Sequence, residues 1–156
     1  MPGTLAPPSL RTGHVGLNVT DLDRSVAFYR RLLGLEVAGE GTEPDRRFAL
    51  LAKDGALLLT LWQQSSGRFA PGAPGLHHLS FQVDSVAEVR AVEEVLKDLG
   101  AGFAHEGVVP HGEGADSGGV FFTDPDGIRL EVFTASGVAA EGGHAPDTTA
   151  PTCGFF

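Results

Sequence analysis

The stretch GVFFTDPDGIRLEVF, residues 119–133, decides the fold because it has the pattern of a β-hairpin. Asp124, Pro125 and Gly127 are residue types favoured at positions i, i+1 and i+3 of a type I turn. In the strand that follows, residues 128–134, alternation places Glu131 on the face opposite the aliphatic residues. A carboxylate in such an apolar strand is costly to bury unless it is paired or binds a metal. Glu131 is therefore the first candidate functional residue.

Composition describes one ordinary domain. The chain has 156 residues, 42% of them hydrophobic and 20% charged, which is typical of a globular protein. The net charge of -9 argues against nucleic acid and anionic membranes as partners, and no apolar run has the length of a membrane span. The N-terminus lacks the order of a signal peptide. Cys153 is the only cysteine, which excludes an internal disulfide and fits a reducing cytoplasm. We therefore expect a cytoplasmic protein that binds neither nucleic acid nor membranes.

The same order of elements is predicted twice along the chain. Strand alternation over residues 12–19 is followed by a helix over residues 22–33, which Gly34 ends, and by three strands over 35–39, 48–52 and 56–63. The second unit has a strand over 78–83, a helix that starts with the capping box Ser85-x-x-Glu88, a strand near 101–105, and the opening hairpin. The sequence thus predicts an α+β fold built from a repeated βαβββ module.

Composition also sets the expected boundaries. We predict an N-terminal arm over residues 1–10 and a single domain over 11–135, with modules at about 11–64 and 76–135 and a linker at 65–75. Residues 136–156 are rich in Gly, Ala, Pro and Thr and show no period, so we expect a disordered tail. Phe155 and Phe156 are the two places where this tail is expected to dock.

Three stretches together resemble a known family. They are HVGLNVTDLDRSVAFYRRLLGLEV (residues 14–37), HLSFQVDSVAEV (78–89) and FFTDPDGIRLEVF (121–133). Their order is similar to that of the vicinal oxygen chelate superfamily, which includes glyoxalase I, extradiol dioxygenases, fosfomycin-modifying enzymes and bleomycin-binding proteins. The resemblance implies that the two modules form an eight-stranded open barrel with a metal in the cup between them. It is specific for the fold and not for the reaction, because the fold hosts many chemistries.

The positions that match the family's metal ligands are His14, His78 and Glu131. Alternation agrees, since each lies on the strand face opposite the aliphatic residues. Two imidazoles and a carboxylate would hold a divalent metal, Fe, Mn, Ni or Zn, and leave adjacent positions open for a substrate with vicinal oxygens. Glyoxalase I has a carboxylate as a fourth ligand where we align Leu59, which argues against a four-ligand isomerase and leaves a three-ligand lyase open. The residues expected to line the cup and bind substrate are Leu57, Leu59, Leu61, Arg129 and Phe133.

Candidates for a catalytic acid or base lie in or beside a Gly-rich loop over residues 107–119. They are His105, His111 and Glu113, although a solvated polar loop is the interpretation that we favour for this segment. By strand alternation, His77 points away from the side of His78, between strand and helix.

Two classes of function follow. One is a metal-dependent dioxygenase (an oxidoreductase) or lyase/isomerase, which the triad favours. The other is a metal-free small-molecule-binding protein of the bleomycin-resistance type, which the leucines and Trp62 keep open. We expect a homodimer in which the metal ligands come either from one chain or from two.

Overall fold

The chain folds as the same βαβββ module used twice, as the computed structural model shows for the residues it describes, 8–146 and 156. The first module comprises β1 (Val15–Val19), α1 (Leu22–Leu33), β2 (Glu36–Gly41), β3 (Phe48–Lys53) and β4 (Ala56–Gln63). The second comprises β5 (Leu79–Val83), α2 (Val86–Asp98), β6 (Val109–Pro110), β7 (Gly118–Thr123) and β8 (Arg129–Thr134), followed by the 3-10 helix η1 (Ala139–Glu141). The predicted repeat is confirmed.

One predicted strand is wrong. Within the expected strand at residues 101–105, only Phe103 forms a bridge, to Phe122. The strand that fills this place in the module is the two-residue β6, at residues 109–110. The segment between Phe103 and β6 bends at Gly107, whose φ of 68° interrupts a strand.

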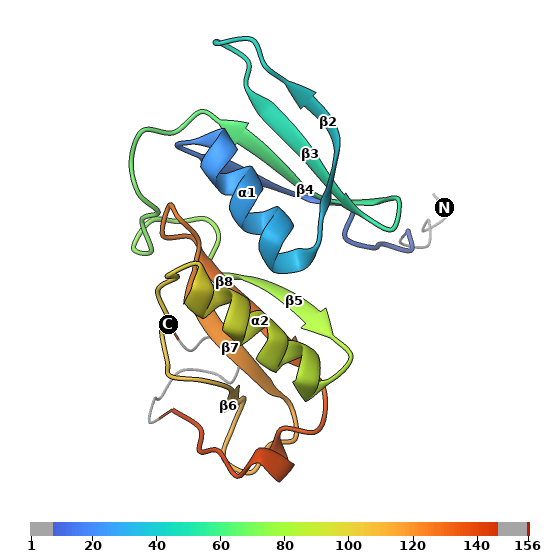
Figure 1. Ribbon diagram of the computed structural model, residues 1–156, viewed down its shortest axis with the longest axis vertical. Coiled ribbons are helices and arrows are strands. Elements are labelled where there is room, and N and C mark those ends of the chain that lie inside the picture. The colour runs from blue at the N-terminus through green and yellow to red at the C-terminus, as the bar shows by residue number, and fades with distance from the viewer. Residues whose placement is uncertain (1–7, 147–155) are drawn as a thin grey trace, which may run out of the picture.

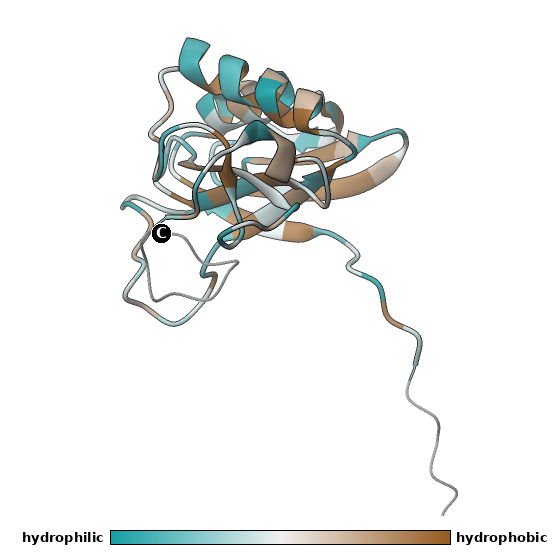
Figure 2. Cartoon of the chain, turned by 90° about the horizontal axis from the view of Figure 1, so that it is seen from below, coloured by the Kyte–Doolittle hydropathy of each residue, from teal (hydrophilic) through white to brown (hydrophobic). Residues whose placement is uncertain are grey.

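Each module forms its own four-stranded sheet. The strand orders are β1-β4-β3-β2 and β5-β8-β7-β6, and in both sheets the first and last strands of the module pair in parallel. The two sheets lie one above the other in Figure 1, and α1 and α2 cover the same side of them in Figure 2. The sheets are open and do not close into a barrel within one chain. Their helix-free faces therefore point the same way and not at each other.

Local sequence determines where the helices begin and end. The side chain of Asp21 accepts a hydrogen bond from the Arg24 N–H at 3.0 Å, and Gly34 ends α1 with φ 63°. Ser85 and Glu88 form the predicted capping box, since Ser85 Oγ accepts from the Glu88 N–H at 3.3 Å and Glu88 accepts from the Asp84 N–H at 3.0 Å.

The hairpin turn of the second module is fastened to the first module. Tyr29 on α1 donates its hydroxyl hydrogen bond to Asp124 Oδ2 at 2.8 Å, and the N–H groups of Asp126 and Ile128 donate to Asp124 Oδ1. The Gly127 N–H bonds the Asp124 carbonyl at 3.0 Å, which confirms the predicted turn. Burial raises the pKa of the Asp124 carboxyl and also the pKa of Tyr29. This junction sits beside one continuous hydrophobic core shared by both modules.

The segment predicted as a disordered tail begins with ordered structure. Val138 is buried, its N–H bonds the Asp116 carbonyl at 2.9 Å, and Glu141 of η1 pairs with Arg90. Residues 147–155, with Cys153 and Phe155, lie outside the described residues. No helix in the described part of the chain is long and apolar enough to cross a membrane.

Candidate metal and substrate site

The second sheet carries a buried carboxylate on its helix-free face. Glu131 on β8 is paired with Ser80 on β5 and with Phe121 on β7, and its side chain is only 2% exposed. Ser80 donates its hydroxyl hydrogen bond to Glu131 Oε2 at 2.9 Å. We call this surface the Glu131 face. Its residues are Ser80, Phe121, Arg129, Glu131 and Phe133 on the strands and His78 directly before β5.

His78 reaches the same carboxylate. Its Nε2 lies 3.6 Å from Glu131 Oε2, and its side chain is 16% exposed. Burial lowers the pKa of His78, although the nearby Glu131 acts in the opposite direction. A neutral imidazole is the form that can bind a metal. His77 Nδ1 lies 2.9 Å from His78 Nδ1, at the edge of this face and not between strand and helix as predicted.

His111 is the side chain that sequence reasoning undervalued. Its Nε2 lies 2.5 Å from Glu131 Oε1, and its Nδ1 lies 3.0 Å from Ser117 Oγ. The His111 N–H also bonds the Ser117 carbonyl at 2.9 Å, so both ends of the short loop 111–117 are tied together. Its ring centroid is 5.3 Å from that of Phe133. Nothing in the spacing of the sequence predicts this approach, because it depends on how the loop folds back over β7 and β8.

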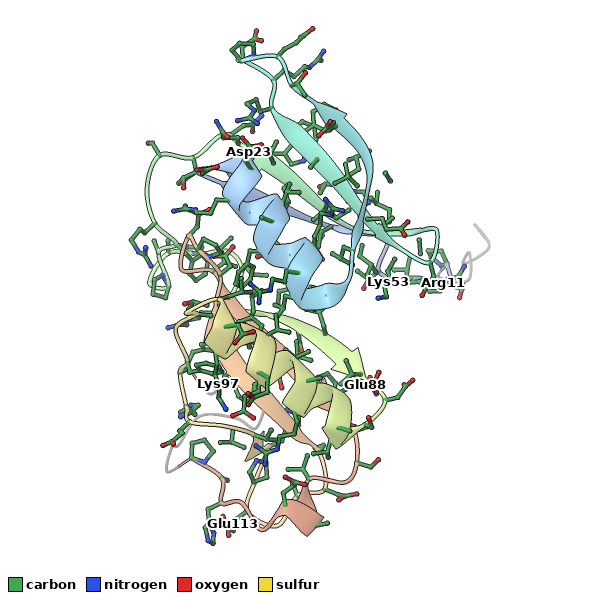
Figure 3. All side chains as sticks on the ribbon, viewed as in Figure 1. Arg11, Asp23, Lys53, Glu88, Lys97 and Glu113 are labelled. Carbon is green, nitrogen blue, oxygen red and sulfur yellow. The ribbon has the colours of Figure 1, made fainter. Side chains whose placement is uncertain are left out.

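Of the other two catalytic candidates, His105 contacts a residue of the Glu131 face, and Glu113 lies away from that face. The ring centroid of His105 is 6.1 Å from that of Phe121. Glu113 lies at the end of the second module that is farthest from the first (Figure 3), where it accepts hydrogen bonds from His144 and the Ala145 N–H. These contacts, led by the one from His144, lower the pKa of Glu113.

His14 belongs to the first module and does not join Glu131 within one chain. It stands directly before β1 as His78 stands directly before β5, and it is exposed. Within residues 8–146 and residue 156, no group of three or more His, Cys, Asp or Glu side chains has the arrangement of a metal site. The reason is the arrangement of the sheets, whose helix-free faces point in the same direction.

The position equivalent to Glu131 in the first module is Thr60 and not Leu59. Gly16 pairs with Thr60 as Ser80 pairs with Glu131, and each lies two residues after its histidine. The difference arises from a bulge, because Leu51 pairs with Leu59 whereas Ala52 pairs with Leu57. Thr60 is buried, and Trp62 Nε1 donates to its hydroxyl at 3.2 Å. The first module therefore has no carboxylate at the position equivalent to Glu131, as predicted, but the residue at that position is Thr60.

The leucines predicted to line the cup are placed differently. Leu59 and Leu61 pair with Val15 and Leu17 and are fully buried in the core beneath α1, so they cannot touch a substrate. Leu57 is half-buried on the other side of the bulge. Arg129 and Phe133 do share the face of Glu131.

The donor set fits two ligands of a divalent metal. Glu131 supplies a carboxylate whose orientation Ser80 fixes, and His78 supplies a ring nitrogen beside it. His111, already at the carboxylate, offers a further ring nitrogen at this site.

Known proteins resemble this chain in sequence and fold. The family model of the Glyoxalase/Bleomycin resistance protein/Dioxygenase superfamily matches residues 11–132. A trivalent organoarsenical cleaving enzyme of Bacillus sp. (strain MD1) is 30% identical over 92% of this chain and 83% of its own length. A lactoylglutathione lyase of Salmonella typhimurium is 29% identical over 81% of this chain and 93% of its own.

Two solved structures share the fold. A glyoxylase/bleomycin resistance protein/dioxygenase domain from Frankia sp. EAN1pec has a TM-score of 0.68 and 29% identity, covering 81% of this chain and 93% of its own. The fosfomycin resistance protein FosX of Listeria monocytogenes, solved with Mn(II) and 1S,2S-dihydroxypropylphosphonic acid, has a TM-score of 0.60 and 20% identity, covering 83% of this chain and 96% of its own.

Proposed function

The chain belongs to the Glyoxalase/Bleomycin resistance protein/Dioxygenase superfamily, and from that premise we propose that it is a divalent-metal-dependent enzyme acting on a small substrate with neighbouring oxygen atoms. The observation that carries the proposal is the buried Glu131 carboxylate, which Ser80, His78 and His111 approach on the helix-free face of the second sheet. Within the described residues this carboxylate, which is 2% exposed, meets two imidazoles and a hydroxyl but no Lys or Arg, an environment that a bound cation would stabilise.

The ligands are His78 and Glu131 of one subunit and His14 of a second copy of the chain. His14 and His78 occupy equivalent positions in their modules, and both helix-free faces lie on the same side of the chain. A homodimer in which each first module covers a partner's second module brings the three side chains together twice. Exposure of His14 in the single chain supports this arrangement.

The chemistry follows from a three-ligand site. The bound metal, Fe, Mn, Ni or Zn, supplies Lewis acidity and open positions for two substrate oxygens. Glu131 holds negative charge at the site, Ser80 keeps its carboxylate oriented, and Arg129 and Phe133 border the substrate. Thr60, whose hydroxyl is neutral, stands where a fourth carboxylate would be required. A dioxygenase or a three-ligand lyase is therefore favoured over a four-ligand isomerase.

A metal-free binding protein is the second candidate function. The stacked pair Phe48 and Trp62, with ring centroids 4.9 Å apart and an angle of 28° between their planes, supports it. These aromatic side chains suit the capture of a flat apolar ligand.

Metal binding separates the two candidates. The untagged protein is stripped with EDTA, titrated with Mn²⁺, Fe²⁺, Ni²⁺ and Zn²⁺ in turn, and compared with Glu131→Gln and with Glu113→Gln as the matched control. We expect Glu131→Gln to lower metal affinity by at least about 100-fold, because it removes the charged ligand, and Glu113→Gln to change it little. If none of the four ions shows binding that depends on Glu131, the proposal of a metal-dependent enzyme fails and the metal-free binding protein is supported.

A further inference from the structure

A small hydrophobic cluster lies apart from the main core, beside the proposed ligands. It consists of Val109 on β6, Phe121 on β7 and the half-buried Phe156, the last residue of the printed sequence. Phe121 is fully buried although it sits on the helix-free side of the sheet, paired with Glu131. The main core lies on the other side, beneath the helices. Something therefore covers the Glu131 face, and the ring of Phe156 is part of that cover.

The ring of Phe156 is held by groups that favour an aromatic system. Its centroid is 5.7 Å from that of Phe121, with the ring planes at 74°, an edge-to-face arrangement. It is 5.7 Å from the ring of His78 and 6.4 Å from the ring of His77. The guanidinium carbon of Arg129 lies 5.3 Å from its centroid, within the range of a cation–π contact.

These walls do not depend on Phe156 for their position. Phe121 and Arg129 project from paired strands, and Phe121 also meets the rings of His105 and His111. Within the part of the chain that is described, no ion pair of Arg129 is recorded, so its charge is available to a ring. An edge-to-face ring, a tilted imidazole ring and a cation together select a π system over an aliphatic group of equal size, because only the π system has a quadrupole.

We infer that Phe121, His78 and Arg129 form an aromatic-ring subsite on the Glu131 face, and that Phe156 is an intramolecular occupant that competes with aryl ligands for it. The ligand class is a small molecule with one aromatic ring. This inference rests on the proposed function where it places the ring beside metal ligands, since His78 is both a wall of the subsite and a proposed ligand. The ring contacts themselves involve no metal.

Competition has a measurable consequence. An aryl ligand binds only the fraction of molecules from which Phe156 is displaced, so its apparent affinity is reduced by that fraction. Removing the Phe156 ring leaves the walls in place and takes away the competitor. The affinity for an aryl ligand should then increase, whereas loss of any ordinary packing residue would leave it unchanged or decrease it.

The test uses two neutral probes of similar size, 2-phenylethanol and 2-cyclohexylethanol, measured by calorimetry on the full chain loaded with Mn²⁺ and on the EDTA-stripped chain. We expect Phe156→Ala to bind 2-phenylethanol about fivefold more tightly than the wild type. In the Phe156→Ala background, Arg129→Gln should lower the ratio of the affinities for 2-phenylethanol and 2-cyclohexylethanol about threefold, since it removes the cation without disturbing the core. Phe103→Leu, in the half-buried bridge on β7's far edge, is the matched control and should change neither probe.

Three outcomes decide the matter. A Phe156→Ala chain that binds 2-phenylethanol no more tightly, while Glu131-dependent Mn²⁺ binding is intact, overturns the subsite and leaves the proposed function standing. An equal gain for 2-cyclohexylethanol also overturns it, because the slot would then be merely apolar. A gain for the aryl probe alone supports it, and if Mn²⁺ binding does not depend on Glu131 the subsite then belongs to a binding protein.

Discussion

The two modules share one topology and differ on their helix-free faces. In the first, β1 and β4 bring together small or neutral residues, Gly16 opposite Thr60. In the second, the equivalent pair is Ser80 and Glu131, and the loop carrying His111 folds over them. The same backbone thus provides an uncharged surface in one half and a buried charged centre in the other. Fold and repeat therefore predict where a site can lie, and a few side chains decide which half carries its charge.

The hairpin turns differ in the same way. Asp54 and Gly55 form a two-residue turn with positive φ at both positions, and both are exposed. Asp124 occupies the corresponding turn of the second module, and it is buried against Tyr29 of the first. One turn ends a hairpin, and the other also joins the modules.

The largest expected effect tests whether each metal site is built from the second module of one chain and the first module of another. His14→Ala and Glu131→Gln should each bind metal at least about 100-fold more weakly as separate homodimers. Unfolding and refolding an equal mixture should recover about a quarter of the wild-type sites, because half of the dimers are mixed and each of these has one intact site. Metal content after dialysis measures the recovery.

Two results would contradict that arrangement. Recovery near zero in a mixture that light scattering shows to be dimeric means that the ligands come from one chain. Monomers at micromolar concentration would exclude the shared site directly.

The second prediction tests the register of β4. Leu59→Ala should lower the free energy of unfolding by about 2–5 kcal/mol, because it opens a cavity in the core beneath α1. Leu57→Ala, at a half-buried position before the bulge, should cost clearly less. Urea denaturation gives both values. If Leu59→Ala left stability unchanged and weakened ligand binding, Leu59 would line the cup, as the sequence analysis predicted.

These residues also show what the sequence could and could not predict. The repeat, the Asp21 and Ser85 caps and the Asp-Pro-Asp-Gly turn follow from local patterns within a few residues, and all are confirmed. The prediction that Leu59 is equivalent to Glu131 was wrong because a bulge adds one residue to β4, and no local pattern reveals that bulge. The approach of His111 to Glu131 depends on a loop fold, and the position of His14 depends on how whole modules are arranged. Both are long-range properties that alternation does not contain.

The third prediction concerns the junction between the modules. Tyr29→Phe should lower the free energy of unfolding by about 1–3 kcal/mol, since it removes the hydroxyl that donates to the buried Asp124. Arg31→Ala, which removes an exposed ion pair with Asp98 between the two helices, is the control and should cost less than about 1 kcal/mol. Equal effects in urea denaturation would mean that the junction contributes no more than a surface contact.

The smallest expected effect is the pH dependence of stability that arises from Asp124, because this turn residue is buried whereas Asp54 in the first module's turn is exposed. Burial raises the pKa of Asp124 above its usual value of 3.8, so the fold favours the protonated carboxyl. The corresponding stability is fully present below pH 3.8 and is lost as pH rises through the higher pKa of the folded state. Asp124→Asn is neutral at every pH and cannot lose it. The free energy of unfolding of Asp124→Asn should therefore improve relative to the wild type between pH 3.5 and pH 7, as followed by urea denaturation at each of about five pH values. A difference that moves in the wild type's favour over this range would show that the hydrogen bonds from Tyr29, Asp126 and Ile128 outweigh burial and that the turn prefers a charged Asp124.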